Sequence, residues 1–512
     1  MGGRQLVAAL RTGRSSLART KDVPERAAIL GAGVSGRGAA LALASRCPDV
    51  RVFAQSQPDP SASLELESAG VRVHVDTNPE RLAQTVVQFA PDVIVASPGI
   101  PPHSPLIMGP RSSGLRVVGE VQLAWDLGHA DGDEGTPWLC VTGTNGKTTT
   151  TAMLASILRT AGLRAPAVGN IGEPIVTAVL QQPDVLPVEL SSYQLATSPD
   201  LSPWASICLN IDSDHLDWHG TREEYAAAKA LIYSRVQRAR IFFEDEPEVA
   251  AIATAAAETG GGPAVPLQFG AVNAGALGVD GGLLIDRAFS GTGTGEPVVL
   301  ADLASIDLLA GATGPDAASD PFVRDALAAA ALARSIGVSP QAIQDGLARF
   351  QPHGHRRALV PTDDGIRWID DSKATNVHAA LAAARAVPRH HLVWIVGGDP
   401  KGQDLAPLFR FAADRAKALV LVGADPGPIA ELAARLAPRV PAWVAPASTD
   451  GPAGYADIVR VCAEFADAGD TVLLAPGCAS WDQFSSYEQR GDAFAGAASN
   501  QASEGLEDNP GR

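Results

Sequence analysis

The sequence predicts an α/β protein of three successive domains. Its 512 residues exceed the length at which a single hydrophobic core stops growing, about 250–300 residues. Apolar runs of strand length alternate with helical stretches near residues 27–119, 138–335 and 354–477, which is the pattern of parallel sheets flanked by helices. The first two stretches open with a glycine-rich turn between a strand and a helix.

The first predicted domain begins with a strand, a glycine turn, a helix and a second strand. The strand AAILGAG starts at Ala27, the helix GRGAALALA starts at Gly36, and the strand VRVFA follows. This βαβ start is Rossmann-like. PDVIVAS and LRVVG supply further strands, and GHADGDEGT at 128–136 has the composition of a linker. We therefore expect a domain over residues 23–128, preceded by a basic extension at 1–22.

The second predicted domain, residues 129–352, opens with the strand WLCVT and a glycine loop at 143–148. The helix TTTAMLASILRTAG follows, and VLPVEL and WASICLN continue the sheet. Residues 261–314 carry turn signals and little helical periodicity, which indicates a hairpin and loops before the Ala-rich helix DALAAAALARS. The order of strand, glycine loop and helix is that of a P-loop ATPase-like domain.

The third predicted domain, residues 353–496, is again Rossmann-like. Its strand-like runs IRWIDD, HLVWIVGG, KALVLVG and DTVLLAPG are separated by helical stretches. Residues 497–512 consist mainly of polar and small residues. We expect them to form a disordered tail.

Charge and cysteine content exclude several classes of protein. A formal net charge of −17 is unfavourable for nucleic-acid binding, which needs a basic surface to neutralise phosphates. No run of about 18 apolar residues is present to span a membrane. The five cysteines are far apart and show no metal-binding spacing. We expect a monomeric, cytoplasmic protein that acts on small molecules.

The strongest motif is TGTNGKT at residues 142–148. The backbone amides of such a loop, together with the N-terminus of the following helix, hold phosphate oxygens. In this pattern Lys147 reaches the β- and γ-phosphates, and the hydroxyl of Thr148 binds Mg²⁺. Val141 stands where the general pattern has its first glycine. Because the loop lies between a strand and a helix, it predicts a nucleotide site.

Two polar segments follow apolar strands of the same domain. Glu189 lies in VELSSYQL, and NIDSDHLDWH occupies residues 210–219. Metal and substrate groups gather at strand ends in α/β domains, and carboxylates suit hard cations. A turn cap or a solvated loop is the structural alternative for each segment. The neighbouring phosphate loop favours a metal site.

Together these motifs resemble those of the Mur ligases. The resemblance also includes EEYAAAKALIY, His355-Arg356, DDSKATN at 370–376, GGDPKG at 397–402, and LLAPGCASWDQFSSYEQRG. It covers the chain from about Ala27 to Phe494. DDSKATN and ASWDQF with EQRG are characteristic of the member that adds D-glutamate. The resemblance implies ATP-dependent ligation of D-glutamate to UDP-N-acetylmuramoyl-L-alanine in peptidoglycan synthesis, and hence a part in cell-wall biogenesis, cell shape and cell division.

The resemblance implies roles for individual residues. Contacts to ATP would come from Gly143, Thr144, Asn145, Gly146, Lys147, Thr148, Thr149, Arg356 and Asp371. The catalytic set would be Lys147, Glu189, His215 and Lys229. Two Mg²⁺ ions would be held by Thr148, Glu189, His215 and a carbamylated Lys229. The nucleotide sugar would contact Val34, Ser35, Gly99, Asn170 and His215. D-glutamate would be framed by Lys373, Thr375, Lys401, Ser480 and Tyr487.

The expected chemistry agrees with this residue set. Joining a carboxylate to an amine in water requires activation of the acid, and phosphoryl transfer from ATP would give an acyl phosphate that the amine attacks. Mg²⁺ ions would offset the charge of the triphosphate and the carboxylate. A carbamate on Lys229 would be an anionic oxygen ligand, whereas an ammonium would repel Mg²⁺. Without the resemblance, a pairing of Lys229 with Glu223 or Glu224 is the simpler interpretation.

Three departures from the family pattern leave contacts open. Residues 54–56 (Ala-Gln-Ser) stand where an Asp is usual on the uracil side, and DPFVRD at 320–325 replaces a G-x-H-N-x-x-N motif on the adenine side. Ala358 replaces a Glu. The alternatives are another amide ligase, a nucleotide-switch module, or a dinucleotide-dependent oxidoreductase suggested by GAGVSG at 31–36. A dinucleotide-dependent oxidoreductase would also need an acidic residue that binds the ribose, and this chain lacks it.

Overall fold

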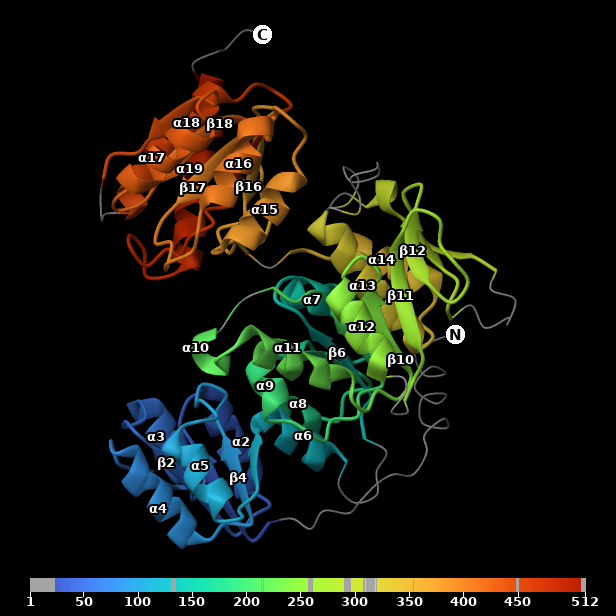
Figure 1. Cartoon of the computed structure of the whole chain (residues 1–512), viewed down its shortest axis with the longest axis vertical. Coiled ribbons are helices and arrows are strands. Elements are labelled where there is room, and N and C mark those ends of the chain that lie inside the picture. Colours follow the sequence, from blue (N-terminus) through green and yellow to red (C-terminus); the bar gives the residue numbers. More distant parts are fainter. Residues whose placement is uncertain are drawn as a thin grey trace. The chain divides into compact units, whose positions relative to one another are not determined.

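The computed structural model describes residues 24–129, 135–212, 214, 216–256, 261–289, 296–306, 309, 318, 320–352, 354–447 and 451–507. The chain forms two compact units: unit 1 comprises residues up to 311 together with 325–350, and unit 2 comprises 312–324 and the residues after 350. Two sheets lie in unit 1 and one in unit 2 (Figure 1). Each of the three sheets corresponds to one predicted domain, so the predicted three-domain α/β architecture is confirmed, with the first two domains together in unit 1. The extension predicted at 1–22, and His215, lie outside the described residues.

The first sheet of unit 1 consists of parallel strands in the order β3-β2-β1-β4-β5. Helices α2, α3 and α6 pack on one face, and α4 and α5 pack on the other (Figure 1). The strand order reverses between β1 and β4, which is where such sheets bind ligands. The elements are β1 (Arg26–Leu30), α2 (Val34–Ala44), β2 (Asp49–Ala54), α3 (Pro60–Ser68), β3 (Arg72–Val75), α4 (Pro79–Phe89), β4 (Val93–Ala96), α5 (Pro105–Ser112), β5 (Val117–Gly119) and α6 (Glu120–Gly128).

Glycines allow α2 to begin directly against the strands. A Cβ atom at Gly36 would lie only 2.1 Å from the carbonyl oxygen of Gly31. Gly31 itself has φ +92°, a conformation that favours glycine. The amide of Gly31 donates to the carbonyl of Phe53, and the amide of Ser97 donates to that of Leu30. The turn is therefore fixed beside the carboxyl ends of β1 and β4.

The second sheet has the order β14-β13-β12-β11-β10-β9-β6-β8-β7. It is parallel from β7 to β12, and β12, β13 and β14 form the hairpin region expected within residues 261–314. The elements are β6 (Trp138–Thr142), α7 (Lys147–Thr160), β7 (Val168–Gly169), α8 (Ile175–Leu180), β8 (Leu186–Glu189), α9 (Ser192–Ala196), β9 (Ala205–Cys208), α10 (Leu216–His219), α11 (Arg222–Ala230), η2 (Leu231–Tyr233), β10 (Ala239–Phe243), α12 (Pro247–Ala255), β11 (Ala264–Phe269), β12 (Leu277–Asp280), β13 (Leu283–Asp286), β14 (Val298–Asp302), η4 (Leu303–Ser305), α13 (Pro321–Ser335) and α14 (Pro340–Ala348).

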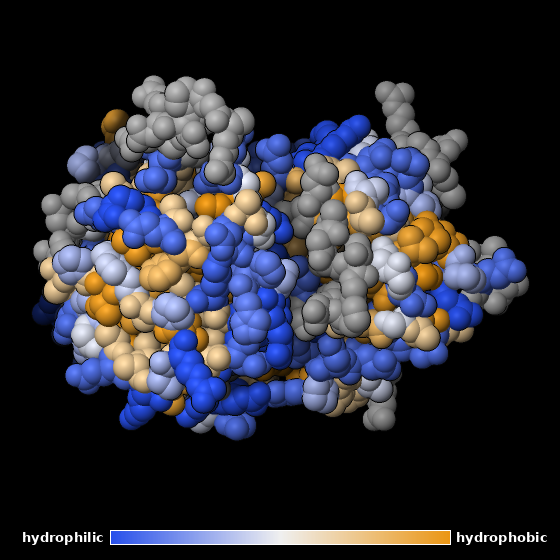
Figure 2. Space-filling view, turned by 90° about the horizontal axis from the view of Figure 1, so that it is seen from above, coloured by the Kyte–Doolittle hydropathy of each residue, from blue (hydrophilic) through white to orange (hydrophobic). Residues whose placement is uncertain are grey.

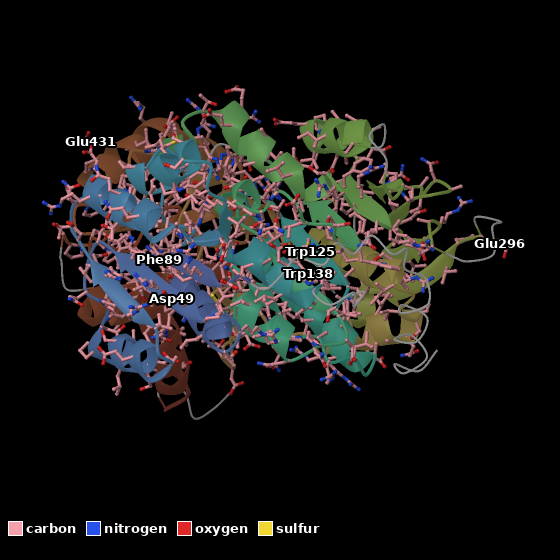
Figure 3. The ribbon with its side chains drawn as sticks, turned by 90° about the horizontal axis from the view of Figure 1, so that it is seen from below. Asp49, Phe89, Trp125, Trp138, Glu296 and Glu431 are labelled. Atoms are coloured by element: carbon pink, nitrogen blue, oxygen red, sulfur yellow. The ribbon has the colours of Figure 1, made fainter. Side chains whose placement is uncertain are left out.

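Helix α6 connects the two sheets of unit 1. The Glu120 carboxylate accepts a hydrogen bond from the amide of Val176 at the start of α8, at 2.9 Å. The rings of Trp125 in α6 and Trp138 in β6 meet edge to face, with centroids 5.0 Å apart (Figure 3). One buried cluster includes side chains from both sheets. The helix therefore contributes to both cores.

The sheet of unit 2 has the order β15-β16-β20-β17-β18-β19, with only the β15–β16 pair antiparallel. Helices α15, α16 and α17 pack on one face, and α18 and α19 pack on the other. The elements are β15 (Ala358–Val360), β16 (Arg367–Asp370), α15 (Val377–Arg385), β17 (Leu392–Gly397), α16 (Ala406–Arg415), β18 (Ala416–Val422), α17 (Gly427–Leu436), β19 (Ala442–Val444), α18 (Gly451–Phe465), β20 (Thr471–Leu474) and α19 (Tyr487–Glu507).

The last helix extends further than its composition predicts. Disorder is expected from residue 497, yet α19 continues to Glu507. Phe494 and Ala498 are both fully buried in a core of unit 2, and residues four apart lie on the same face of a helix. Packing therefore keeps the helix intact beyond the point at which its residues become polar. Residues 508–512 lie outside the described part of the chain.

The surface and the cysteines agree with the predicted composition class. Figure 2 shows hydrophobic residues lying among hydrophilic ones on the face in view. Among the described helices, none combines the length and apolar character needed to cross a bilayer. All five cysteines belong to the described residues, where they are buried and form no disulfide. Burial raises the pKa of the Cys208 thiol to about 12, so it is unreactive at neutral pH.

Glu120 makes the stability of the α6–α8 contact depend on pH. Burial raises the pKa of this carboxyl from its usual 4.5 to about 7, so the folded chain holds the proton more tightly than the unfolded chain. The resulting stabilisation is complete below the pKa of Glu120 in the unfolded chain, and it is lost as the pH rises through the pKa of Glu120 in the folded chain. A shift of this size corresponds to a free energy on the order of 3 kcal/mol.

We expect Glu120→Gln, whose amide imitates the protonated carboxyl, to raise the melting temperature at pH 8 and to change it little at pH 5. Scanning calorimetry at the two pH values measures the difference. Glu67→Gln, at an exposed position of α3, is the control and should have little effect at either pH. A lower melting temperature for Glu120→Gln at pH 8 would contradict the assignment.

Candidate functional site

The phosphate loop predicted from the sequence connects β6 to α7 at the carboxyl edge of the second sheet. Strand β6 lies between β8 and β9, both parallel to it, so the segments after these three strands meet at one edge. The amides of Thr144 and Asn145 each donate to the side-chain oxygen of Asn210, which follows β9, at 2.9 Å. The loop is thereby fixed to its neighbour.

Gly146 determines where α7 begins. It has φ +84°, and a Cβ atom there would lie 2.6 Å from Oδ1 of Asp325. Asp325 Oδ1 also accepts a hydrogen bond from the Thr150 hydroxyl at 2.8 Å. Helix α7 therefore starts immediately after the loop, and its N-terminal turn, which carries Thr148 and Thr149, is directed toward any anion that the loop holds.

Two lysines converge on the same backbone oxygen. The Lys147 ammonium donates to the carbonyls of Gly143 and Thr144, at 2.8 and 2.9 Å. The Lys229 ammonium, from α11, donates to the same Gly143 carbonyl at 2.8 Å. Lys229 is only 2% exposed. Burial, reinforced by the charge of Lys147, lowers the pKa of Lys229 to about 7, so a large share of this lysine is a neutral amine at physiological pH.

Tyr225 positions Lys229 from the same helix. Its ring centre lies 4.7 Å from the Lys229 nitrogen, and its hydroxyl lies 2.9 Å from the Thr144 hydroxyl. Burial raises the pKa of Tyr225 above its usual value, which keeps the phenol neutral. Helix α11 begins with a capping box between Thr221 and Glu224. Helix α11 is thus attached to the phosphate loop through side chains.

Glu189, at the end of β8, has a buried oxygen available to a cation. Its Oε1 accepts a hydrogen bond from the Asn170 amide group at 3.0 Å. Its Oε2 is buried and lacks a hydrogen-bond partner within the described part of the chain. Burying an unpaired carboxylate oxygen is unfavourable, and such an oxygen is the ligand that Mg²⁺ prefers. The donor chemistry of Thr148 and Glu189 therefore fits Mg²⁺.

A complete metal cluster is not found in the residues that the structure describes, where no group of three or more His, Cys, Asp or Glu side chains could hold an ion. His215, one of the predicted ligands, lies outside those residues. The sequence also did not single out Tyr225 as part of the site. Its position one helical turn before Lys229 is the signal that could have indicated it.

The residues predicted to bind the nucleotide sugar lie in two places in unit 1. Val34 and Ser35 open α2, and Gly99 follows β4, so these three gather where the order of the first sheet reverses. Beside them the hydroxyl of Ser97 is buried, with no hydrogen-bond partner among the described residues. Asn170 lies instead on the second sheet, where it contacts Glu189.

Four of the five residues predicted to bind D-glutamate lie in loops at the carboxyl edge of the unit 2 sheet, and the fifth, Tyr487, begins α19. Strands β16, β20 and β17 are parallel neighbours, and the loops after them carry Lys373 with Thr375, Ser480, and Lys401, respectively. The Lys373 nitrogen lies 3.7 Å from the centre of the Tyr487 ring. The Lys401 nitrogen lies 5.7 Å from the ring centre of Trp481, the neighbour of Ser480. The three loops thus place cations and hydroxyl groups at one sheet edge.

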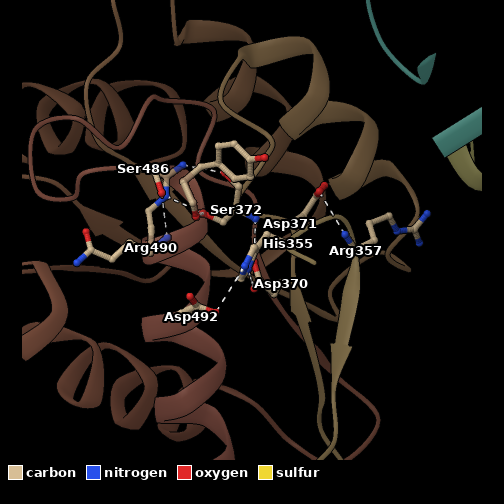
Figure 4. A network of polar contacts seen from close by, with 10 residues as sticks. His355, Arg357, Asp370, Asp371, Ser372, Ser486, Arg490 and Asp492 are labelled. Carbon is tan, nitrogen blue, oxygen red and sulfur yellow. Dashed lines mark hydrogen bonds and ion pairs between the residues drawn. The ribbon is translucent and has the colours of Figure 1, made fainter. Parts of the chain in front are cut away.

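A second polar group in unit 2 surrounds Asp370 and Asp371 (Figure 4). Nδ1 of His355 lies 2.7 Å from the Asp370 carboxylate. The Arg357 amide donates to Asp371 at 3.3 Å. Burial raises the pKa of Asp371 to about 6, although the charges of Arg357 and Arg356 oppose this shift. The predicted ATP contacts Arg356 and Asp371 therefore influence each other electrostatically.

Arg357 also holds the segment that departs from the family pattern. Its guanidinium donates to the Asp320 carboxylate at 3.1 Å and lies 5.0 Å from the centre of the Phe322 ring. Asp320 in turn accepts hydrogen bonds from the amides of Phe322 and Val323 at the start of α13. The sequence did not identify Arg357, because the ion pair joins positions 37 residues apart.

Comparison with known proteins identifies the family. The family described as Mur ligase middle domain matches residues 141–265, and the one described as Mur ligase, glutamate ligase domain, matches residues 355–478. A protein of Thermobifida fusca named UDP-N-acetylmuramoylalanine--D-glutamate ligase is 43% identical over 477 residues, which cover 92% of this chain and 97% of that protein. The chain belongs to the Mur ligase family. Mur ligases are ATP-dependent enzymes of peptidoglycan precursor synthesis.

Other Mur ligases extend the comparison. Proteins of Streptomyces coelicolor and Mycolicibacterium smegmatis with the same name are 42% and 41% identical, over 92% of this chain and 96% of each relative. Among solved structures, a pseudomurein peptide ligase type C from Methanothermus fervidus aligns with a TM-score of 0.53 at 17% identity, covering 94% of this chain and 100% of that one. UDP-N-acetylmuramate-alanine ligase from Thermotoga maritima aligns with a TM-score of 0.50 at 16% identity, covering 93% and 99%. These structures share the fold.

We expect Lys147→Ala to lower the turnover of ATP-dependent phosphate release by about 10²- to 10³-fold, because one preformed charge that stabilises the transferring phosphoryl group is lost. Steady-state assays of phosphate release measure the change, and circular dichroism verifies folding. Arg159→Ala, at an exposed position of the same helix, is the control and should retain the wild-type rate. Half or more of the wild-type turnover in Lys147→Ala would refute the role of Lys147.

Proposed function

We propose that this Mur ligase joins D-glutamate to UDP-N-acetylmuramoyl-L-alanine through an acyl phosphate, as a monomer in the cytoplasm. The observation that carries the proposal is the set of loops in unit 2, where Lys373, Lys401 and Ser480 lie in the segments DDSKATN, GGDPKG and ASWDQF. The name shared by relatives at 41–43% identity supports the same substrate pair. We also propose the domain limits 23–128, 129–352 and 353–496.

The nucleotide is held mainly by the N-terminus of α7. Lys147, now bonded to the loop carbonyls of Gly143 and Thr144, exchanges these oxygens for those of the β- and γ-phosphates. Loop residues 143–149 would supply further donors, and the family resemblance also assigns ATP contacts to Arg356 and Asp371. Because phosphoryl transfer depends mostly on positioning and charge, these residues act by orienting the phosphate and offsetting its charge.

Mg²⁺ offsets the charge of the triphosphate and of the attacking carboxylate when it is bound. Thr148, Glu189, His215 and the modified Lys229 would hold two such ions. The support within the structure is the buried oxygen of Glu189, which lacks a hydrogen-bond partner among the described residues. The other Glu189 oxygen is oriented by Asn170, so the carboxylate has a fixed direction.

Lys229 is suited to carbamylation. Its neutral amine attacks the carbon of CO₂, a C–N bond forms, and the proton released from nitrogen goes to solvent, which leaves an anionic carbamate. The lowered pKa of Lys229 makes the neutral amine available. The product also relieves a repulsion, since the carbamate would face the Lys147 ammonium as an opposite charge rather than as a like charge.

The substrates are anionic, whereas the chain as a whole is acidic, so local cations must bind them. Lys373 and Lys401 would meet the two carboxylates of D-glutamate, and Thr375, Ser480 and Tyr487 would orient them. The nucleotide sugar would contact Val34, Ser35 and Gly99 at the reversal point of the first sheet, together with Asn170 and His215. Each of these substrates is a small molecule.

The direct test is phosphate release from ATP by the purified full chain. We expect release only when UDP-N-acetylmuramoyl-L-alanine and D-glutamate are both present, and much slower release with L-glutamate, because the asymmetric set of cations and hydroxyl groups distinguishes the enantiomers. Assays that omit each substrate in turn are the controls. Equal use of both enantiomers, or release without the nucleotide sugar, would exclude the proposed function.

We expect Lys229→Ala to be nearly inactive and to recover partly with added acetate or formate, which would replace the missing carboxylate oxygens. Ligation rates with and without these small carboxylates measure the rescue, and depletion of bicarbonate should lower the wild-type rate as well. Lys147→Ala is the matched control, because it removes a lysine from the same oxygen and should not be rescued. Full activity of Lys229→Ala without any additive would remove the carbamate from the mechanism.

A further inference from the structure

Arg490, in the first turns of α19, is a buried cation whose hydrogen bonds, among the described residues, all go to neutral oxygens. It is only 2% exposed. Its Nε donates to the Ser372 hydroxyl at 3.0 Å, and its Nη2 donates to the Ser372 carbonyl at 2.8 Å. Its two Nη groups also donate to the Cys478 carbonyl, and Nη1 donates to the Ala479 carbonyl. Figure 4 shows Arg490 beside Ser372.

These contacts join the loops that carry the residues proposed for D-glutamate. Ser372 precedes Lys373, and its hydroxyl donates to the carbonyl of Tyr487 at 2.8 Å. Ala479 precedes Ser480. The loops after β16 and β20 and the start of α19 are therefore fastened to one guanidinium, a planar group whose donors have a fixed geometry.

The loop that carries Lys401 is attached to the same network by one further step. The backbones of Asp399 and Ala479 exchange hydrogen bonds of 3.0 and 2.8 Å. The Asp399 carboxylate then accepts from the amide of Lys401 at 2.9 Å. Lys401 has φ +47°, a conformation that is strained for a residue with a Cβ atom. The position of Lys401 thus depends on a loop that Ala479, and through it Arg490, holds in place.

The charge of Arg490 is not neutralised by a direct ion pair with any described carboxylate. Burial lowers the pKa of the guanidinium from its usual value, yet arginine remains protonated in proteins. Two carboxylates lie near enough to act on its charge, Asp482 and Asp370. Asp482 accepts a hydrogen bond from the Ala424 amide, and Asp370 is engaged by His355. A positive charge in a region of low dielectric, surrounded by carbonyl oxygens, extends its attraction to anions that bind nearby.

We infer that Arg490 is the positioning residue of the acceptor site: it fastens three loops so that Lys373, Lys401 and Ser480 converge on the acceptor, and its charge favours a dianionic amino acid there. This inference rests on the proposed use of D-glutamate. Arg490 acts through other residues, so its removal changes the binding of the acceptor and leaves the binding of the nucleotide sugar, which is assigned to unit 1, unaltered.

The test compares Arg490→Lys, Ser372→Ala and the double variant in steady-state ligation. Arg490→Lys keeps the charge but cannot reproduce the planar set of donors, and we expect it to raise the KM for D-glutamate at least tenfold. Ser372→Ala removes only the hydrogen bonds of the hydroxyl group and should raise the KM for D-glutamate about threefold or more. Because both changes break one network, the increase in the KM for D-glutamate in the double variant should be smaller than the product of the increases in the two single variants.

In each variant the KM for UDP-N-acetylmuramoyl-L-alanine should stay within twofold of wild type, and the KM for ATP, whose proposed contact Asp371 precedes Ser372, should rise less than the KM for D-glutamate. Arg460→Lys, at an exposed ion pair of α18, is the matched control and should behave as wild type. If circular dichroism shows that Arg490→Lys fails to fold, the KM for D-glutamate measured with Ser372→Ala tests the inference instead. An unchanged KM for D-glutamate, or an equal rise in the KM of all three substrates, would overturn the inference. Wild-type enzyme that releases phosphate without D-glutamate would instead show that the proposed function has failed.

Discussion

The site in unit 1 depends on two lysine side chains, the buried Lys229 and the half-buried Lys147, which donate to one backbone carbonyl, that of Gly143. Like charges so close together are unfavourable in a region of low dielectric. The structure offers two ways to relieve the repulsion: Lys229 loses its proton, or it becomes an anion. Tyr225, the capped helix α11 and the glycine loop hold the lysines in this arrangement. The proposed phosphate binding, metal binding and modification of Lys229 all rely on this one arrangement.

The same design recurs at the carboxyl edge of each sheet. In the first sheet, the glycine turn after β1 lies where the strand order reverses between β1 and β4. In the second, the segments after β6, β8 and β9 meet around the phosphate loop. In the third, the loops after β16, β17 and β20 are joined by Arg490. Parallel strands place their carboxyl ends together, so residues far apart in the chain become neighbours without long connections.

Much of this could be predicted from the sequence, for reasons that are visible in individual residues. Strands β1, β6, β17 and β20 are fully or almost fully buried, so they appear as continuous apolar runs. Strand β3 was missed, because RVHV is only partly buried and contains Arg72 and His74. The tail was assigned to disorder because its composition is polar, whereas Ala498 is held in the core by packing that composition does not encode.

The functional residues divide in the same way. Lys147, Glu189 and Lys229 could be proposed from the sequence, since they lie in short motifs with a fixed spacing or at the end of an apolar strand. Contacts between distant segments could not be found, because they require the fold. Asp325 accepts a hydrogen bond from the hydroxyl of Thr150, which lies 175 residues away in the chain. Arg490 donates to Ser372, which lies 118 residues away. His215 belongs to a predicted motif but lies outside the described residues.

The most direct test of the account is the chemical state of Lys229. Enzyme equilibrated with ¹³C-labelled bicarbonate and Mg²⁺ should give a carbamate signal in the ¹³C NMR spectrum. The signal should be absent from Lys229→Met and should persist in Arg159→Ala. It should weaken as the pH falls below the lowered pKa of Lys229, because protonation removes the neutral amine. A wild-type spectrum without any carbamate signal, recorded on active enzyme, would contradict the proposed origin of the site's charge balance.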